Sequence, residues 1–285
     1  MKRESLATLP QEAEIQRSRV LLSHASIEIF PSPTVSERVI RTFGGSGKKI
    51  AVTSSPNLPI ESTVAISESL LSNGFQVVPH IGAFEIENRG HLKKIAAQLR
   101  GLGIGEIFVV QGDREQKGTY RTSSQVLNDL AETGVKFDKI GIAGYPEGIP
   151  GLTEEQLLKG IRTREELAGK MGANIYLVTQ MCFDANSIVN FINSLRRNGI
   201  DVPVIIGLPV PERRGKLFDV ASRCKVRDSK QRILEVGGVG EEFLPEKLAD
   251  NVALIGGPDL NAGYHIYSFN RLKRLQEWFD DLDKV

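Results

Sequence analysis

Short apolar runs rich in β-branched residues alternate along the chain with longer stretches in which apolar residues recur every three or four positions. The short runs are typical of buried strands, and the longer stretches are typical of amphipathic helices. Eight strands are predicted, over residues 26–30, 50–54, 76–81, 106–111, 139–143, 173–179, 202–207 and 264–269. Helices are predicted between them, over residues 60–72, 91–102, 123–132, 154–170 and 186–198.

The order of these elements predicts the fold. A glycine follows each of the five helices, where a left-handed capping residue belongs: Gly74, Gly103, Gly134, Gly172 and Gly199. Alternating strands and helices imply a parallel sheet with right-handed crossovers. Because there are eight strands, we predict an α/β fold of one domain over residues 1–285, a closed (β/α)8 TIM barrel. Residues 1–25 are expected to form an extra N-terminal helix outside the first strand. The alternative to the barrel is a doubly wound open sheet.

Composition and charge narrow the class of protein. The 285 residues are 40% hydrophobic and 25% charged, with a formal net charge of +1, which is typical of a globular domain. A net charge so close to zero argues against a broad nucleic-acid or membrane surface. No apolar run approaches the ~18 residues that a membrane helix needs, and the polar N-terminus lacks the apolar core of a secretory signal. We therefore expect a cytoplasmic protein.

Two glycine-rich segments resemble nucleotide-binding loops but lack the required pattern. "GGSGKK", residues 44–49, does not match the phosphate-loop consensus and precedes a strand, so we predict a helix-to-strand turn. "GLGIGE", residues 101–106, ends a helix and lacks the dinucleotide fingerprint. The four histidines are scattered, and Cys182 and Cys224 are far apart with no metal-binding spacing, so no metal site is predicted.

Polar side chains recur where the predicted strands end, which is where barrel enzymes carry their chemistry. They are Glu28, Thr53, His80, Asp113, Tyr145, Gln180 and Arg271. Taken singly, each has a structural explanation, such as a buried structural histidine or an aspartate that caps a turn. Taken together, so many polar groups around one opening would need partners, and a flat polar ligand would supply them.

Two of these residues are acids in contrasting settings. Glu28 stands among Ile27, Ile29 and Phe30, and burial favours the protonated form of a carboxyl, which suits a general acid. Asp113 follows Gly112, a residue that lets a ligand approach the backbone closely. A carboxylate at this position could stabilise a cation electrostatically. One proton donor and one fixed negative charge suit a reaction that passes through an iminium ion.

Eight ordered segments together resemble the methylenetetrahydrofolate reductase family, a family of flavin-dependent barrels. They span residues 26–271 and read "SIEIFPSPT", "AVTSS", "PHIGA", "VVQGD", "GYPEGIP", "GANIYLVTQMCFD", "GIDVPVIIGLPV" and "YHIYSFNR". The resemblance implies that NAD(P)H reduces bound FAD, which passes hydride to the methylene carbon of a folate. It implies interconversion of 5,10-methylenetetrahydrofolate and 5-methyltetrahydrofolate, with a small-molecule folate as partner; assembly into a homo-oligomer is left open.

The resemblance also implies roles for individual residues. Glu28 matches the acid that helps to open the folate ring, and Asp113 matches the carboxylate that stabilises the resulting cation. Substrate-binding positions are matched by Gln180, Phe269 and Arg271. Flavin-lining positions are matched by Thr53, His80, Gln111, Gly112, Asp113, Tyr120 and Tyr145.

Several positions depart from the family's pattern. Many members have an arginine where this chain has Gln111, and a histidine where it has Ile149. A lysine and polar residues that reach the FAD phosphates in many members align with Ala168 and Arg164, and either Arg162 or Arg164 could compensate. Losing one charge-assisted phosphate contact costs ~1.5–3 kcal/mol. Two alternatives therefore stay open: a flavin-independent reductase using NADH directly, and a non-catalytic folate-binding subunit.

Overall fold

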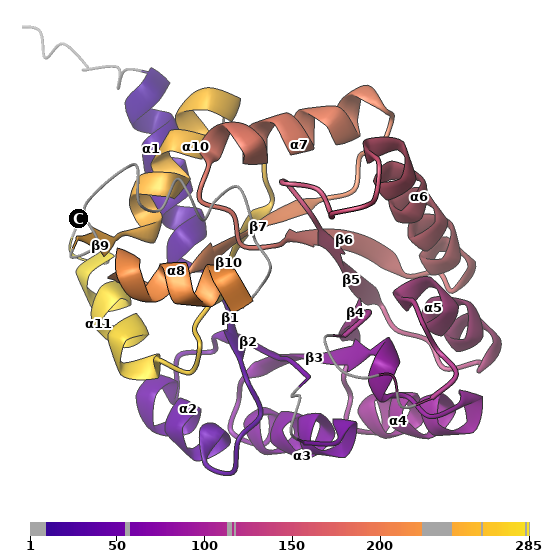
Figure 1. Cartoon of the computed structure of the whole chain (residues 1–285). Coiled ribbons are helices and arrows are strands. Elements are labelled where there is room, and N and C mark those ends of the chain that lie inside the picture. Colours follow the sequence, from indigo (N-terminus) through magenta and orange to yellow (C-terminus); the bar gives the residue numbers. More distant parts are fainter. Residues whose placement is uncertain are drawn as a thin grey trace, which may run out of the picture.

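Eight parallel strands form a closed barrel in the computed structural model, which describes residues 10–54, 58–112, 116, 118–223, 241–257, 259–282 and 284. Around the ring the strands follow the order β1-β10-β7-β6-β5-β4-β3-β2 (Figure 1). They are β1 Ser26–Ile29, β2 Lys49–Val52, β3 Gln76–Gly82, β4 Glu106–Val110, β5 Lys139–Gly144, β6 Asn174–Thr179, β7 Val204–Pro209 and β10 Gly263–Tyr267. The predicted (β/α)8 barrel is confirmed, and the doubly wound alternative is wrong.

Helices cover the outside of this ring (Figure 1). They are α1 Pro10–Ser23, α2 Val35–Phe43, α3 Ile60–Leu71, α4 Arg89–Gly101, α5 Ser123–Glu132, α6 Glu154–Lys170, α7 Ala185–Arg197, α8 Arg214–Arg223, α10 Pro245–Gly256 and α11 Leu272–Leu282, with a short 3-10 turn η1 at Ala83–Glu85. The five glycines predicted to end helices have φ values between 67° and 82°. Within the described parts of the chain, the helices are all too short or too polar to cross a membrane.

Local sequence signals explain where two of the central helices begin. Thr122 precedes α5, and its side chain accepts a hydrogen bond from the backbone N–H of Gln125. The side chain of Gln125 in turn accepts a hydrogen bond from the backbone N–H of Thr122. Thr153 and Gln156 form the same reciprocal capping box at the start of α6. A capping box satisfies N–H groups that the first turn of a helix leaves without partners. Both helices therefore start in the loops at the carboxyl ends of β4 and β5.

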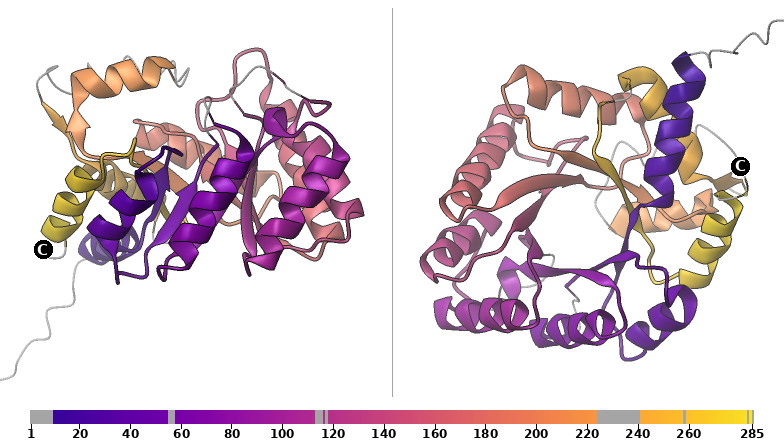
Figure 2. Two further views of the ribbon diagram at one scale, coloured as in Figure 1. Left: turned by 90° about the horizontal axis from the view of Figure 1, so that it is seen from below. Right: turned by 180° about the vertical axis from the view of Figure 1, so that it is seen from behind.

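The predicted N-terminal helix is present as α1, which packs against α10 and β10, the neighbour of β1 in the barrel. Ser18 Oγ and Tyr264 Oη lie 2.8 Å apart in the buried part of this contact. Arg19 donates two hydrogen bonds to Asp250 of α10, at 2.9 and 2.6 Å. A bidentate arginine–carboxylate pair is among the stronger polar contacts in proteins. It fixes α1 on the opposite side of β10 from the barrel interior (Figure 2, right).

The hydrophobic core has two parts that follow from strand alternation. Most buried apolar side chains lie in the shell between the strands and the helices. A smaller cluster fills the inside of the barrel, with Ala51, Val78, Phe108 and Val178 at its centre. Gly141 makes room for this cluster, because a Cβ there would lie 2.3 Å from the Phe108 ring. The barrel is therefore packed along its axis and is not a pore.

An ion pair occupies the amino end of the barrel interior. Lys49 Nζ lies 2.8 Å from both carboxylate oxygens of Glu106, across the ring from β2 to β4. Burial, and then the negative charge of Glu106, raise the pKa of Tyr176 well above its usual range. A cavity of about 300 Å³ opens at this end, but its lining includes the paired charges Lys49 and Glu106. The ion pair and the apolar cluster fill the amino half of the barrel interior.

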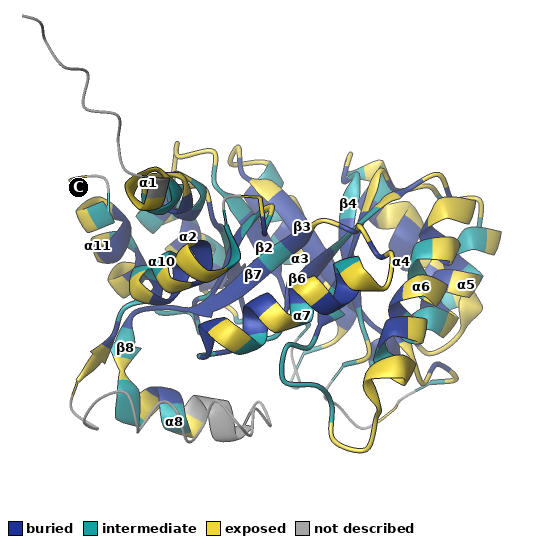
Figure 3. Cartoon of the chain, turned by 90° about the horizontal axis from the view of Figure 1, so that it is seen from above, coloured by how far each residue is buried: buried dark blue, intermediate teal, exposed yellow. Residues whose placement is uncertain are grey.

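The described part of the segment between β7 and α10 stands outside the ring of helices on the carboxyl side (Figure 2, left). It contains α8 and a two-stranded antiparallel ribbon, β8 Glu212–Arg213 and β9 Glu242–Phe243. Figure 3 shows α8 projecting away from the body of the barrel. The ribbon is tied to the barrel by the ion pairs Arg271–Glu212 and Arg274–Glu242. Its Phe243 ring also packs edge-on against Phe183, with centroids 5.2 Å apart.

Candidate functional site

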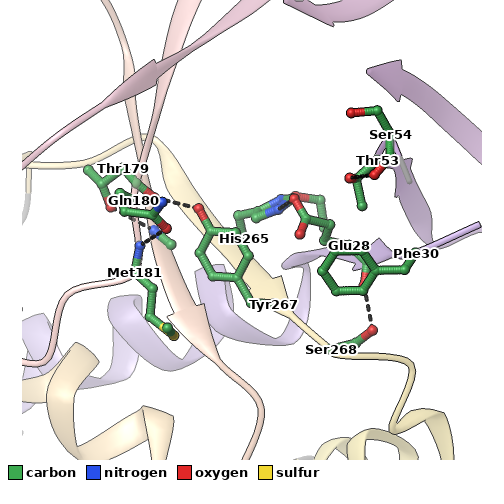
Figure 4. Close-up of polar contacts among 12 residues, drawn as sticks. Glu28, Phe30, Thr53, Ser54, Thr179, Gln180, Met181, His265, Tyr267 and Ser268 are labelled. Atoms are coloured by element: carbon green, nitrogen blue, oxygen red, sulfur yellow. Dashed lines mark hydrogen bonds and ion pairs between the residues drawn. The ribbon is translucent and has the colours of Figure 1, made fainter. Parts of the chain in front are cut away.

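Glu28 is the buried acid at the centre of the candidate site. It lies on β1, where Ile27 and Ile29 point into the shell and Glu28 points into the barrel, and it is 9% exposed. Its neighbours across the ladder are Ala51 of β2 and Tyr267 of β10. Its backbone carbonyl accepts a hydrogen bond from Ser268 Oγ (Figure 4). The predicted burial of this carboxyl among apolar strand residues is confirmed.

His265 gives Glu28 a partner that the sequence reading did not identify. Its Nε2 lies 3.4 Å from Glu28 Oε2, and its Nδ1 lies 2.8 Å from Ser26 Oγ. Ser26 and Glu28 lie two residues apart on β1, so they point to the same side of the strand. His265 bridges them from β10. The side chains form a buried line that runs from serine through imidazole to carboxyl.

His80 lies on β3 and faces the same interior. Burial lowers the pKa of His80 to about 4, although the nearby negative charge of Glu28 acts in the opposite direction. His80 is therefore neutral at physiological pH, and its ring can donate or accept a hydrogen bond but carries no charge. The ring packs on Phe108, with centroids 4.6 Å apart.

The predicted cofactor positions on β2 to β5 lie side by side along the rim. Thr53 follows β2 and donates from Oγ1 to the carbonyl of Ser54, at 2.7 Å. Gln111 and Gly112 follow β4, and Gly112 has a φ of 94°, which favours glycine. Tyr145 follows β5 and is half-buried. The remaining predicted residue of this group, Asp113, lies outside the described residues.

The predicted substrate positions come from β6 and β10. Gln180 follows β6, and its Oε1 accepts a hydrogen bond from the backbone of Met181 at 2.8 Å (Figure 4). Phe269 follows β10 and stacks on Phe30, with ring centroids 6.3 Å apart and planes 21° apart. Arg271 forms an ion pair with Glu212 of the ribbon. The predicted residues of this group therefore lie around the same carboxyl-side opening as Glu28.

Tyr120 differs from the other predicted residues. Its hydroxyl donates a hydrogen bond to Asp129 Oδ2 of α5 at 2.7 Å. Burial, followed by this hydrogen bond, raises the pKa of Tyr120. The hydroxyl is therefore engaged by α5, and the ring contributes apolar surface.

Arg164 supplies a positive charge near Tyr145. Its Nε donates to the carbonyl of Gly160 at 2.9 Å, and its Nη1 lies 3.4 Å from Ser123 Oγ. These acceptors are neutral, and within the described residues no carboxylate forms an ion pair with Arg164. Burial lowers its pKa, while interaction with Tyr145 raises it. Ala168, four residues later on α6, is fully buried and offers no donor.

The sequence contained a signal for the residues that were missed. In "YHIYSF", His265 and Tyr267 alternate with the apolar residues Tyr264 and Ile266. That period of two places His265 and Tyr267 on the inner face of the strand. Tyr267 Oη donates to the carbonyl of Thr179 at 2.8 Å (Figure 4), immediately before Gln180. Applying the alternation to β10 would have identified both residues.

The arrangement provides a specific set of chemical groups. A buried carboxyl with an imidazole partner can give or take a proton, and a neutral histidine can hydrogen-bond a ring nitrogen. The Phe30–Phe269 pair offers a flat apolar surface beside the carboxyl. Such a site is suited to proton transfer on a planar, heteroatom-rich ligand.

Comparisons with known proteins match this chain to one family. A model of the family "Methylenetetrahydrofolate reductase" matches residues 31–227. "Probable methylenetetrahydrofolate reductase (NADPH)" of Caenorhabditis elegans is 24% identical over 291 residues, covering 91% of this chain and 43% of that protein. "Methylenetetrahydrofolate reductase (NADH) 1" of Arabidopsis thaliana is 25% identical over 147 residues, covering 45% of this chain and 24% of that protein. "5,10-methylenetetrahydrofolate reductase" of Pectobacterium carotovorum is 26% identical over 206 residues, covering 70% and 66%. The chain thus spans less than half the length of the nematode and plant relatives.

Proposed function

Because the chain belongs to the methylenetetrahydrofolate reductase family, we propose that it is an oxidoreductase that interconverts 5,10-methylenetetrahydrofolate and 5-methyltetrahydrofolate. NAD(P)H is the proposed source of hydride. The observation that carries the proposal is the buried Glu28 carboxyl, which faces the open end of the barrel and lies 3.4 Å from His265. The proposed substrate is the one for which the relatives are named, and this carboxyl is the proposed source of the proton that the reaction needs.

Glu28 is proposed as the general acid. Reduction requires the five-membered ring of the folate to open, and its leaving nitrogen then needs a proton. Glu28 gives that proton, and the hydride adds to the exposed methylene carbon. A positioned acid typically contributes ~10²–10⁴-fold to such a step. Asp113 is carried over by resemblance as the carboxylate that stabilises the intermediate cation.

His265 and Ser26 support the proton transfer by Glu28. When Glu28 is charged, His265 can donate from Nε2 to the carboxylate while Nδ1 accepts from Ser26 Oγ, since these atoms lie at 3.4 and 2.8 Å. When Glu28 is protonated, both hydrogen bonds can reverse without movement of a heavy atom. The line of three side chains therefore accommodates both states of the acid.

The rim residues fit a bound FAD, which when present relays hydride from the nicotinamide to the folate. Arg164 is the observation in favour, because its described hydrogen-bond acceptors are neutral and it lies near Tyr145 at the rim. An anionic diphosphate would provide the missing counter-charge. Thr53, His80, Gln111, Gly112 and Tyr145 would line the rest of the cofactor.

A flavin-independent reductase is the second candidate, and one observation favours it. The residue aligned with the family's phosphate-binding lysine is Ala168, which is fully buried and cannot contact a phosphate. In that case NADH would pass hydride directly to the folate in the same opening. The role of Glu28 would be unchanged.

The test is a turnover assay on the purified protein with 5,10-methylenetetrahydrofolate and NADH or NADPH, with and without added FAD. The visible spectrum is recorded in parallel, because a flavin band reports bound FAD directly. Turnover that requires FAD supports the flavin mechanism, and turnover by colourless protein supports the second candidate. Absence of turnover under every one of these conditions would refute the proposed function.

The role of Glu28 is tested by Glu28→Gln, which keeps the shape of the side chain and removes the acid. We expect turnover to fall by ~10²-fold or more, while binding of 5-methyltetrahydrofolate is retained. Glu37→Gln is the matched control, because Glu37 is an exposed residue of α2. Unchanged turnover in Glu28→Gln would refute the assigned acid.

A further inference from the structure

The turn between β10 and α11 contains unusual backbone conformations. Phe269 and Asn270 have φ values of 49° and 57°, and among the described non-glycine residues only these two have positive φ. A left-handed conformation costs an ordinary residue roughly 1–2 kcal/mol, and asparagine tolerates it better than most. Such conformations persist where the surroundings impose them, and they cluster at functional sites.

Asn270 is fixed by hydrogen bonds from four directions. Its side-chain Oδ1 accepts from the backbone N–H of Phe30, and its Nδ2 donates to the carbonyl of Phe30, both at 2.9 Å. Its own N–H donates to Ser268 Oγ at 3.1 Å, and its carbonyl accepts from Arg38 at 2.6 Å. The side-chain amide thus makes the two hydrogen bonds to the Phe30 backbone that a neighbouring strand would otherwise make.

The consequence of these bonds reaches the candidate site. The β1–β10 ladder ends with Glu28 opposite Tyr267, and the Asn270 amide extends the hydrogen bonding by two residues, to Phe30. Because Phe30 follows Glu28 by two residues, its side chain lies on the same side of the chain as that of Glu28. Figure 4 shows the two side chains next to each other. The left-handed turn also places the Phe269 ring on Phe30, at 6.3 Å.

We propose that Asn270 is a positioning residue, whose side-chain amide holds Phe30 and Phe269 together as an aromatic wall beside Glu28. The wall receives the reduced pterin of the folate and places it against the acid. This inference rests on the proposed function for the identity of the ligand. The mechanical part, in which Asn270 holds Phe30, rests on the hydrogen bonds alone.

Only an amide meets the requirement at this position, because Phe30 presents one donor and one acceptor. Asn270→Gly keeps the left-handed backbone, since glycine adopts it freely, and removes both side-chain bonds. Asn270→Asp keeps the shape and the acceptor but places a carboxylate against the Phe30 carbonyl. The pair of variants separates the amide bonds from the backbone conformation.

The experiment measures KM and kcat for the folate in the wild-type protein and in both variants. We expect KM to rise by about tenfold in the variants, which corresponds to the free energy of roughly one lost hydrogen bond. We expect little change in kcat, because Glu28 and His265 are not altered. The control is Asn261→Gly, because Asn261 Nδ2 donates to the Gly263 carbonyl at 2.9 Å at the other end of β10. This control should leave both constants unchanged.

Hydrogen exchange of the Phe30 amide gives a readout that needs no folate. We expect faster exchange in Asn270→Gly, which removes the acceptor of the Phe30 N–H, and unchanged exchange in Asn261→Gly. Wild-type KM together with wild-type exchange in Asn270→Gly would overturn the inference. If the wild-type protein neither binds nor turns over a folate, the proposed function fails, and the exchange data alone decide whether Asn270 holds Phe30.

Discussion

His80 makes a quantitative prediction about stability and pH. The perturbation is His80→Gln, which keeps a hydrogen-bonding side chain of similar length and removes the titrating imidazole. In the folded protein burial lowers the pKa of His80 to about 4, whereas an unfolded histidine titrates near ~6.5. Between these values the unfolded chain binds a proton that the folded protein does not.

The sign and size of the effect follow from this difference. Because the unfolded state binds more protons below pH 6.5, the His80 contribution to stability is complete above that pH and is lost as the pH falls. The loss accumulates at ~1.4 kcal/mol per pH unit, so that about 2 kcal/mol has been lost at pH 5 relative to pH 7.5. The full loss would be reached only near pH 4.

Urea unfolding at several pH values between 7.5 and 5 measures this contribution. The free energy of unfolding of the wild-type protein should fall relative to that of His80→Gln by about 2 kcal/mol over this range. His24→Gln is the control, because His24 is exposed near the end of α1, and it should follow the wild-type pH dependence. The same pH dependence in His80→Gln and in the wild type would refute the assignment of a buried neutral imidazole.

Two further predictions concern the inside of the barrel. Replacing Gly207 by alanine should lower the free energy of unfolding by about 1–3 kcal/mol through overpacking, because the added Cβ would lie 2.3 Å from the Thr179 carbonyl. The control Gly169→Ala, on α6 with nothing within 4 Å, should stabilise or leave the unfolding midpoint unchanged, and equal effects of the two changes would contradict the packing argument. Replacing Glu106 by glutamine should lower the free energy of unfolding by about 1–3 kcal/mol, because Lys49 loses its charged partner. Lys49→Met should destabilise the Glu106→Gln variant less than it destabilises the wild-type protein. Additive unfolding free energies in that double-mutant cycle would show that the two side chains do not interact.

Strand alternation and strand number predicted the part of the structure that depends on local pattern. Eight apolar runs separated by amphipathic stretches were enough to predict the barrel, and the position of Glu28 in one of these runs predicted its inward, buried side chain. Strand boundaries were less accurate. The seventh strand was predicted over 202–207 but runs over Val204–Pro209. Pro209 is its last residue, and at the end of a strand the missing N–H of a proline costs little.

Long-range partners could not be predicted in the same way. His265 and Glu28 are separated by 237 residues, and only closure of the barrel brings β10 beside β1. The placement of α1 depends on Arg19 and Asp250, which are 231 residues apart. The ribbon of β8 and β9 has two residues in each strand, which is too short to produce an alternation that could be recognised.

The plugged amino end of the barrel has a kinetic meaning. Lys49 and Glu106 pair at the amino end of the interior and Phe108 packs above them, so ligands would reach Glu28 from the carboxyl ends of the strands. In the proposed reaction the hydride donor and the folate would either bind there one after the other, which requires a carrier to hold the hydride between them, or bind there together. Product inhibition patterns would distinguish the two cases, because reactants that bind one after the other bind different forms of the enzyme.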